Sequence, residues 1–331
     1  MAALVAERAV AVDAVLRACQ VCQSVFKHLV SGETVVKADK SPVTVADLSA
    51  QAVVNSILGR AFPKDPIVGE EDSADLQGDQ GKLLRNKVLA LTNQVLAEPL
   101  SESQLLAAID RGNYVGGSKG RHWTLDPIDG TQGFIRGDQF AVCLALIEDG
   151  QVVLGVMGCP NLLVDLEDTK GSRGSLFIAI KGHGAFQRSF DATNEQPIHV
   201  SQLTDPTMAS FCESVMSSHS SHSDAERIGQ LLHITKPPLR MDSQCKYGCI
   251  ARGDSDIYLR LPVRADYVEK IWDHATGSLL VHEAGGQVTD IDGKPLDFSI
   301  GRYLSANRGI VAANSSIHSR VLQAVQQALS K

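Results

Sequence analysis

Two aspartates three residues apart carry the clearest chemical signal in this sequence. Asp126 and Asp129 lie in the run 123–131, whose first residues favour a strand. Pro127 is expected to end that strand, because proline cannot donate to a β-ladder. Asp129 and Gly130 then predict a tight turn. Carboxylates at a strand end can share one hard cation or hold two, and Mg²⁺ prefers such oxygen ligands.

The backbone around these aspartates adds further polar groups. The carbonyl of Ile128 offers one more oxygen to a cation, and Gly130 and Thr131 offer N–H groups to an anion. Thr131 also carries a hydroxyl. A lone pair of aspartates at this spacing often only caps a turn, so Asp126 and Asp129 do not decide the matter alone.

Two other polar segments accompany this run, at 69–72 (Gly-Glu-Glu-Asp) and at 272–277 (Trp-Asp-His-Ala-Thr-Gly). Together with 126–131 (Asp-Pro-Ile-Asp-Gly-Thr) they resemble the metal-binding motifs of the lithium-sensitive, magnesium-dependent phosphatases. That superfamily includes inositol monophosphatase, inositol polyphosphate 1-phosphatase, fructose-1,6-bisphosphatase and 3′(2′),5′-bisphosphate nucleotidase. The three segments follow one another in the order and rough spacing that the family uses, which makes the combined signal specific.

The resemblance implies a site for two or three Mg²⁺ ions and a pair of residues that activates water. Its implied ligands are Glu70, Asp126, the Ile128 carbonyl, Asp129 and Asp273. Asp47 and Thr131 are the implied pair that activates the attacking water. Structural roles remain open for three of these acids: Asp47 with Thr44 matches a capping box, Asp273 could be an N-cap, and three acids at 70–72 could be a solvated loop.

A second group of polar residues lies after residue 200. Ser243 is expected at the start of a short helix with Lys246 one turn on, an arrangement that can hold a phosphate at a helix N-terminus. Arg260 lies in an alternating strand, and His219 in a polar loop. Each basic residue alone is typical of a solvated surface charge. Their combination resembles the 3′(2′),5′-bisphosphate nucleotidase branch, which implies substrate contacts by Gly130, Thr131, His219, Ser243, Lys246, Arg260 and Asp273.

The resemblance implies hydrolysis of the 3′-phosphate of adenosine 3′,5′-bisphosphate to AMP and phosphate, in sulfur assimilation or nucleotide salvage. It also implies action on 3′-phosphoadenylyl sulfate and inhibition by Li⁺. The alternative within the same superfamily is an inositol polyphosphate 1-phosphatase, alone or as a second activity. A sensor that binds the nucleotide without turnover is a different class of reading, and the full set of acids argues against it.

Composition limits the remaining classes. The 331 residues are 44% hydrophobic and 21% charged, ordinary for a globular protein, and the net charge of −7 argues against a nucleic-acid-binding surface. No apolar run is expected to reach the roughly 18 residues that span a membrane. Seven scattered cysteines without a signal peptide indicate a reducing compartment. We expect a cytoplasmic protein, with an organelle left open, whose partner is a small phosphorylated nucleotide and not a nucleic acid, membrane or protein.

The positioning elements follow from hydrophobic periodicity and turn residues. Helices are expected at 3–30, 48–58, 81–97, 101–110, 224–233 and 316–330, with another beginning at Asp273. Strands are expected at 66–69, 140–147, 152–157, 175–180, 185–187, 209–215, 256–262, 287–291 and 309–313. The turn residues at 148–150 and 181–184 predict two hairpins, one from 140–147 and 152–157 and one from 175–180 and 185–187. Alternating strands and helices indicate an α/β arrangement in the second half. The resemblance implies an α+β layered α-β-α-β-α sandwich. A composition shift at 165–174 predicts the boundary between lobes at 1–165 and 166–331, and two polar-faced helices with a Gly-rich stretch predict an insertion at 73–120 that could cover the site.

Overall fold

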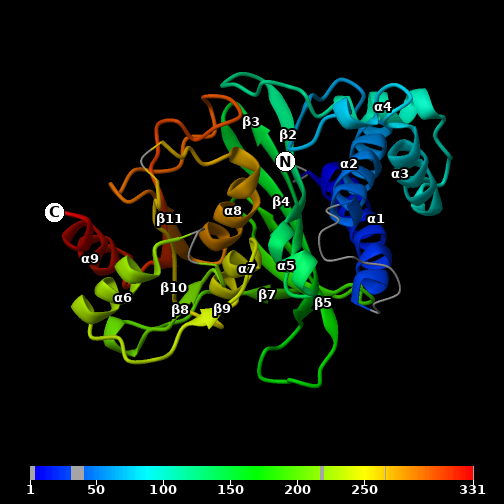
Figure 1. Cartoon of the computed structure of the whole chain (residues 1–331). Helices are drawn as coiled ribbons and strands as arrows, with labels where there is room; N and C mark the ends of the chain where they lie inside the picture. Colours follow the sequence, from blue (N-terminus) through cyan, green and yellow to red (C-terminus); the bar gives the residue numbers. More distant parts are fainter. Residues whose placement is uncertain (1–3, 31–40, 217–219, 265, 331) are drawn as a thin grey trace.

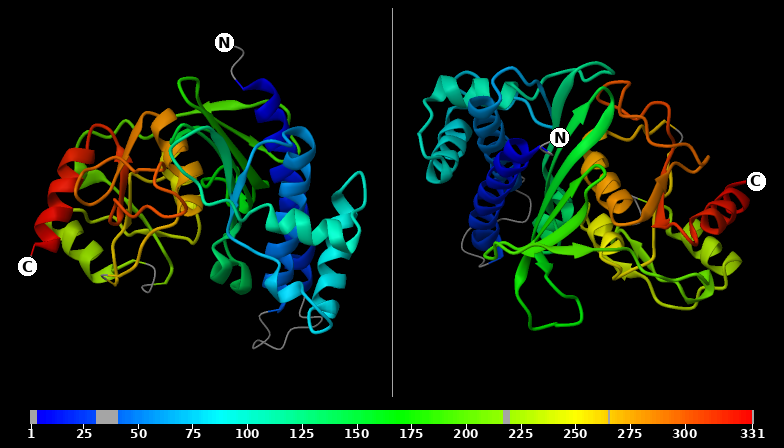
Figure 2. Two further views of the ribbon diagram at one scale, coloured as in Figure 1. Left: turned by 90° about the horizontal axis from the view of Figure 1, so that it is seen from above. Right: turned by 180° about the vertical axis from the view of Figure 1, so that it is seen from behind.

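Helices and sheets alternate in five layers across the molecule (Figure 1). The computed structural model describes residues 4–30, 41–216, 220–264 and 266–330. Helices α1 (Val5–Val30) and α2 (Ser41–Ala61) form one outer layer, and α6 (His222–Leu231) and α9 (His318–Leu329) form the other. Figure 2 shows these two helix pairs on opposite sides with the sheets between them. The predicted layered sandwich is therefore confirmed.

Within the described residues the strands form two sheets. The first runs in chain order through β1 (Ile67–Gly69), β2 (Arg121–Asp129), β3 (Ala141–Glu148), β4 (Gln151–Leu163), β5 (Arg173–Ile180), β6 (Gly184–Ser189) and β7 (Gln196–Ile198). Only β1 and β2 are parallel neighbours in it. The two predicted hairpins are β3–β4 and β5–β6, and both are confirmed.

The second sheet has the strand order β11-β12-β10-β8-β9. Its strands are β8 (Phe211–Glu213), β9 (Leu239–Arg240), β10 (Ile257–Arg260), β11 (Gly286–Thr289) and β12 (Ile310–Asn314). Helices α7 (Cys245–Ala251) and α8 (Ala275–Glu283) lie between the two sheets, and their side chains share one hydrophobic core with both. Because α7 carries Lys246 and Asp273 lies just before α8, the central layer connects the hydrophobic core to polar residues that line the cavity of the site.

Helix α1 packs closely on the first sheet. A Cβ on Gly158 of β4 would come within 2.5 Å of the Cys19 sulfur, so the glycine permits this approach. Ala11, Ala14 and Val15 are fully buried in the same core. The segment Val5–Lys27 is long and apolar enough to cross a membrane, with a mean hydropathy of 1.3. The expectation that no segment reaches that length is wrong, because a helix that covers a sheet needs many of the same apolar residues.

The segment 73–120 adds a helical subdomain beside α2. It contains a 3₁₀ turn (Ala74–Leu76), α3 (Lys82–Val95) and α4 (Glu102–Asp110), which confirms the two predicted helices. Ser101 and Gln104 form a capping box that starts α4. Both helices bury apolar side chains against α2 (Figure 1). They supply none of the described residues that line the cavity between Asp129 and Arg260, and the expected cover over the site stays a prediction.

Two predicted element boundaries are wrong. Helix α2 begins at Ser41, so Asp47 lies inside it and not at its start. Pro42 fits this helix because a first-turn N–H has no intrahelical partner to lose. Strand β2 continues through Pro127 to Asp129. The pairing with β3 shifts register between Asp126 and Asp129, and such an irregularity tolerates a proline that cannot donate.

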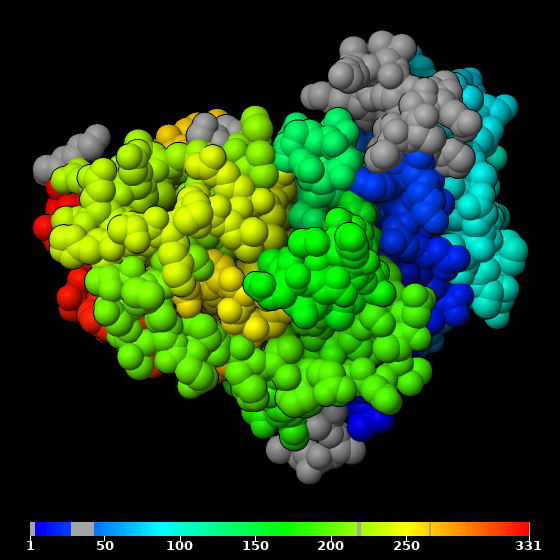
Figure 3. Space-filling view, turned by 90° about the horizontal axis from the view of Figure 1, so that it is seen from below, coloured from blue at the N-terminus to red at the C-terminus, as the bar shows by residue number. Residues whose placement is uncertain are grey.

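The expected lobe boundary at residue 165 falls in the loop between β4 and β5. These strands are neighbours in the first sheet, which continues to Ile198. This loop projects from the lower side of the molecule in Figure 1. In Figure 3 the middle part of the chain, coloured green, lies between the blue N-terminal helices and the yellow segment near residue 245. The division into two lobes and the assignment of 73–120 as an insertion stay predictions.

Candidate active site

Five acids from four separate parts of the fold converge at one edge of the first sheet. Asp47 comes from α2, Glu70 follows β1, and Asp126 and Asp129 end β2. Asp273 ends a 3₁₀ turn (Ile271–Asp273) that leads into α8. The negative charges of Glu70, Asp129, Asp273 and Asp47 all act on Asp126, so the structure brings the predicted acids together.

Four of these acids, Asp47, Glu70, Asp126 and Asp129, lie in an environment that disfavours their ionised forms. Burial, followed by the neighbouring carboxylates, raises the pKa of Asp47 and Asp126 well above the usual range. Burial and Asp273 raise the pKa of Glu70 to about 7, and the same two causes raise that of Asp129 to about 6. Repulsion of this kind is relieved by a divalent cation, which the carboxylates would then hold in their charged forms.

Asp126 gives an independent indication that a cation fits here. It is 2% exposed, and its Oδ1 atom has no hydrogen-bond partner among the described residues. A buried carboxylate oxygen without a donor is costly, and coordination to a metal satisfies it. The oxygen-rich donor set suits Mg²⁺, so the residues fit the group that the sequence predicted.

A left-handed turn sets the backbone after Asp129. Gly130 has φ +88°, a region that side chains disfavour, and a Cβ there would meet the Ser243 Cβ at 2.8 Å. Helix α5 (Thr131–Arg136) starts immediately after it, a short element that the sequence analysis missed. The Thr131 hydroxyl donates to the Ile128 carbonyl at 3.4 Å. The turn thus places Thr131 beside the backbone oxygen predicted to be a ligand.

Basic residues hold the end of β1 in place. Lys270 Nζ lies 3.5 Å from Glu70 Oε1, close enough for an ion pair. Arg302 donates to the Gly69 carbonyl at 2.6 Å, and its guanidinium lies over the Trp272 ring. Lys270 also lies over that ring. The indole therefore anchors both cations, which in turn fix the strand end that carries Glu70.

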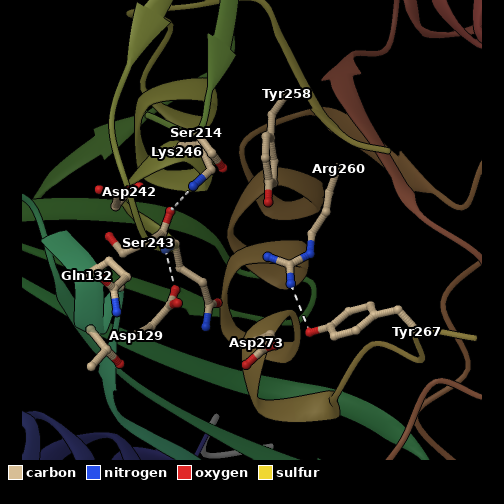
Figure 4. Close-up of a pocket in the computed structure, with 13 residues that line it drawn as sticks. Asp129, Gln132, Ser214, Asp242, Ser243, Lys246, Tyr258, Arg260, Tyr267 and Asp273 are labelled. Carbon is tan, nitrogen blue, oxygen red and sulfur yellow. Dashed lines mark hydrogen bonds between the residues drawn. The ribbon is translucent and has the colours of Figure 1, made fainter. Parts of the chain in front are cut away.

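A cavity of about 390 Å³ opens beside the acids (Figure 4). Asp129 and Asp273 line one part of it, while Lys246 and Arg260 project from α7 and β10 into the other. Of the residues expected to contact substrate, Gly130, Thr131, Ser243, Lys246, Arg260 and Asp273 all line this cavity. His219 lies outside the described residues. A cavity with acids at one end and cations at the other suits a metal-bound phosphate together with a second anionic group.

The start of α7 differs from the expectation for Ser243, whereas a phosphate held by Ser243 and Lys246 stays a prediction. Helix α7 begins at Cys245, and the preceding Gln244 N–H donates to the Asp129 carboxylate. The Gln244 amide is therefore not available to donate to a phosphate. Ser243 has φ +68°, and its carbonyl accepts a 2.9 Å hydrogen bond from Lys246 Nζ. Burial lowers the pKa of Lys246, and Asp129 opposes that shift.

Comparisons with known proteins place the chain in a family. The model of the inositol monophosphatase family matches residues 5–330. The chain belongs to the inositol monophosphatase family. Among curated members of comparable length, a 3′(2′),5′-bisphosphate nucleotidase of Schizosaccharomyces pombe is 45% identical, over 98% of this chain and 96% of its own. Another of that name from Emericella nidulans is 47% identical over 98% of both chains. One from Oryza sativa is 43% identical over 98% and 95%.

Solved structures of family proteins agree with the fold. An inositol monophosphatase from Zymomonas mobilis superposes with a TM-score of 0.64 at 20% identity, covering 98% of this chain and 100% of that one. An inositol monophosphatase from Anabaena gives a TM-score of 0.60 at 23% identity, covering 97% and 95%. At these identities the likeness concerns the fold alone.

The N-cap role that the sequence left open for Asp273 is not observed. A 3₁₀ turn ends at Asp273, and His274 precedes α8. Glu269, Asp273 and His274 offer ligand atoms within 4.8 Å of one another, a group able to bind a metal. Glu269 and His274, however, are bonded to each other at 3.0 Å and are both buried. This leaves Asp273 as the member of the group best placed to bind a cation.

Sequence reasoning missed several residues of the site. The additional residues lining the cavity are Gln132, Ser214, Asp242, Gln244, Tyr258 and Tyr267. Asp242 and Tyr258 lie next to or near Ser243 and Arg260 in the sequence, and both of those residues were expected to contact substrate. Their proximity in the sequence could therefore have identified them. Tyr267 lies in an irregular segment and gave none. His222 supports Ser214, because its Nε2 lies 2.9 Å from the Ser214 carbonyl.

Proposed function

We propose that this chain is a Mg²⁺-dependent phosphatase that removes the 3′-phosphate of adenosine 3′,5′-bisphosphate, giving AMP and phosphate. The observation that carries the proposal is one cavity with a carboxylate cluster at one end and Lys246 and Arg260 at the other. A substrate with two phosphates matches both ends. The names of relatives at 43–47% identity over nearly the full length support the same substrate.

In this proposal the acids of the site have distinct roles. Glu70, Asp126, Asp129, Asp273 and the Ile128 carbonyl would hold two or three Mg²⁺ ions. Bound Mg²⁺ supplies charge neutralisation and lowers the pKa of a coordinated water. Asp47 would accept the proton of the attacking water, and Thr131 would orient that water. The buried setting of Asp47 and its high metal-free pKa agree with a role as proton acceptor.

The remaining pocket residues would bind the part of the substrate that is not cleaved. Lys246 and Arg260 supply positive charge for the 5′-phosphate, and Ser243 a hydroxyl. Charge stabilisation and orientation would then supply the rate, without a covalent enzyme intermediate. By the same argument 3′-phosphoadenylyl sulfate, which keeps both anionic ends, is a second substrate. Li⁺ inhibition through the metal sites and a cytoplasmic role in sulfur or nucleotide metabolism complete the proposal.

The test is phosphate release in the presence of Mg²⁺, with and without Li⁺. The substrates are adenosine 3′,5′-bisphosphate, 3′-phosphoadenylyl sulfate, AMP and inositol 1,4-bisphosphate. Strong preference for the two substrates with a 3′-phosphate supports the proposal. Preference for the inositol substrate would favour an inositol polyphosphate 1-phosphatase and overturn the nucleotide assignment. No release from any substrate would contradict the enzymatic function.

A further inference from the structure

A chain of hydrogen-bonded side chains runs from the buried central layer to the mouth of the cavity. Tyr247 Oη lies 2.9 Å from His274 Nδ1. His274 Nε2 lies 3.0 Å from Glu269 Oε2. Arg260 Nε donates to the other oxygen of Glu269 at 2.8 Å. Arg260 Nη2 then donates to Tyr267 Oη at 3.1 Å (Figure 4). Four consecutive contacts thus connect helix α7 to Arg260 and Tyr267 at the cavity.

The chemistry of the groups fixes the protons along this chain. A charged carboxylate only accepts hydrogen bonds, so His274 Nε2 carries the proton that faces Glu269. His274 Nδ1, the other ring nitrogen, lies 2.9 Å from the Tyr247 hydroxyl oxygen. Burial raises the pKa of Tyr247, so this hydroxyl keeps its proton. Both ring nitrogens of His274 therefore have a hydrogen-bond partner, which holds the imidazole in one orientation.

Glu269 is charged although it is buried. It is 5% exposed and His274 is 1% exposed. Burial alone would raise the pKa of Glu269, but the hydrogen bonds and charges of His274 and Arg260 lower it to about 2. A buried carboxylate with partners on both oxygens is rigid, because moving it would leave a charge unpaired. Glu269 is thus a fixed support for the guanidinium.

This chain of hydrogen bonds restrains Arg260 but does not occupy its whole guanidinium group. Its contacts to Glu269 and Tyr267 occupy Nε and Nη2, while the guanidinium projects into the cavity in Figure 4. The ring of Tyr267 also lies 5.6 Å from the guanidinium carbon. A free arginine side chain loses rotamer freedom when it binds an anion. A restrained one has already lost it, so it binds more tightly.

We propose that Glu269, His274 and Tyr247 are positioning residues that hold Arg260 against the phosphate that is not cleaved. They would thereby set the preference for nucleotides with a second phosphate over those with one. The identity of the ligand rests on the proposed function, whereas the positioning of Arg260 rests on the contacts above.

AMP tests this without turnover, because it carries only the phosphate that is not cleaved. We would measure binding of AMP and of adenosine by calorimetry, and use the ratio of the two constants so that a general loss of folded protein cancels. Glu269→Gln is expected to lower that ratio about tenfold, through loss of a charge-assisted contact that orients Arg260. Tyr247→Phe is expected to lower the ratio less, about threefold, because Tyr247 is three contacts away from Arg260. Glu7→Gln is the matched control, since Glu7 also pairs with an arginine, at 3.0 Å from Arg121.

A double-mutant cycle with Arg260→Ala distinguishes positioning from a direct effect. If Glu269 acts through Arg260, Glu269→Gln changes the ratio in the wild type and has little effect in the Arg260→Ala background. An equal loss in both backgrounds would overturn the proposal. So would a wild-type protein that binds AMP no better than adenosine, or a control that matches Glu269→Gln. Failure of the proposed function is a separate outcome: wild-type protein that prefers AMP yet releases no phosphate from the bisphosphate.

Discussion

At the scale of single residues, the site brings together acids that repel one another and that have few hydrogen-bond partners among the described residues. Asp126 has an oxygen without a donor among the described residues, and Asp129 is bonded through one oxygen to the Gln244 amide. The residue types and their spacing made these acids predictable. Their burial and mutual repulsion, which decide their protonation, come from four separate elements and were not predictable.

Asp129→Asn tests the metal assignment. The amide keeps an acceptor for Gln244 but loses the charge that a cation needs, so phosphate release should fall by about a hundredfold or more. The metal-free protein should stay folded, since repulsion among the acids decreases. Asp191→Asn, at an exposed position, is the control. An active Asp129→Asn enzyme would contradict the assignment.

The raised pKa values predict how the metal-free protein responds to pH. Folding raises the pKa of Glu70 from 4.5 to about 7 and that of Asp129 from 3.8 to about 6. The folded state therefore binds more protons than the unfolded state in this range, and stability from these groups falls as pH rises through it. Thermal unfolding without metal should show this fall, and Mg²⁺ should raise the melting temperature more at about pH 8 than at about pH 5.

Glu70→Gln should reduce this pH dependence, because it removes one of the carboxyl groups whose pKa folding raises. Glu226→Gln, on the exposed face of α6, should leave it as in the wild type. An equal Mg²⁺ effect at both pH values would show that the acids do not bind the ion in their charged forms.

At the scale of elements, the two helices between the sheets approach each other closely. Gly277 of α8 lies against Tyr247 of α7, and a Cβ there would meet the Tyr247 ring at 2.2 Å. Since this glycine is helical, only the lack of a side chain matters. Contact between these helices brings Tyr247 to His274, so packing and site geometry depend on the same position.

Gly277→Ala should therefore destabilise the protein by about 1–3 kcal/mol, or more if the ring cannot move. Gly229→Ala is the matched control, because its Cβ would meet only Phe211, at 3.4 Å, and alanine favours a helix. Chemical denaturation measures both. Equal stability of the two variants would contradict the close packing of α7 on α8.

At the scale of the whole molecule, the cores on both faces of the first sheet hold the cysteines out of solvent. All seven are free and buried. Cys19 and Cys22 of α1 are buried in the core between that helix and the first sheet. Cys245 and Cys249 pack in the central layer. Burial raises the pKa of the Cys22 and Cys143 thiols, which makes the reactive thiolate scarce.

A thiol reagent should therefore modify the native protein slowly and reach all seven cysteines only after denaturation. The measurement is the time course of labelling with and without denaturant. Rapid labelling of a native thiol would identify a region that opens locally and would contradict uniform burial.

The sequence by itself determined the metal motifs, the hairpins, most helices and the family, because these depend on local spacing and turn chemistry. Only the tertiary structure decided which residues meet. The contact between Arg260 and Glu269, the Asp129 carboxylate on the Gln244 amide, and Tyr267 at the cavity all join segments separated in the chain. Burial, repulsion and packing between layers are properties of that assembly, and no local pattern encodes them.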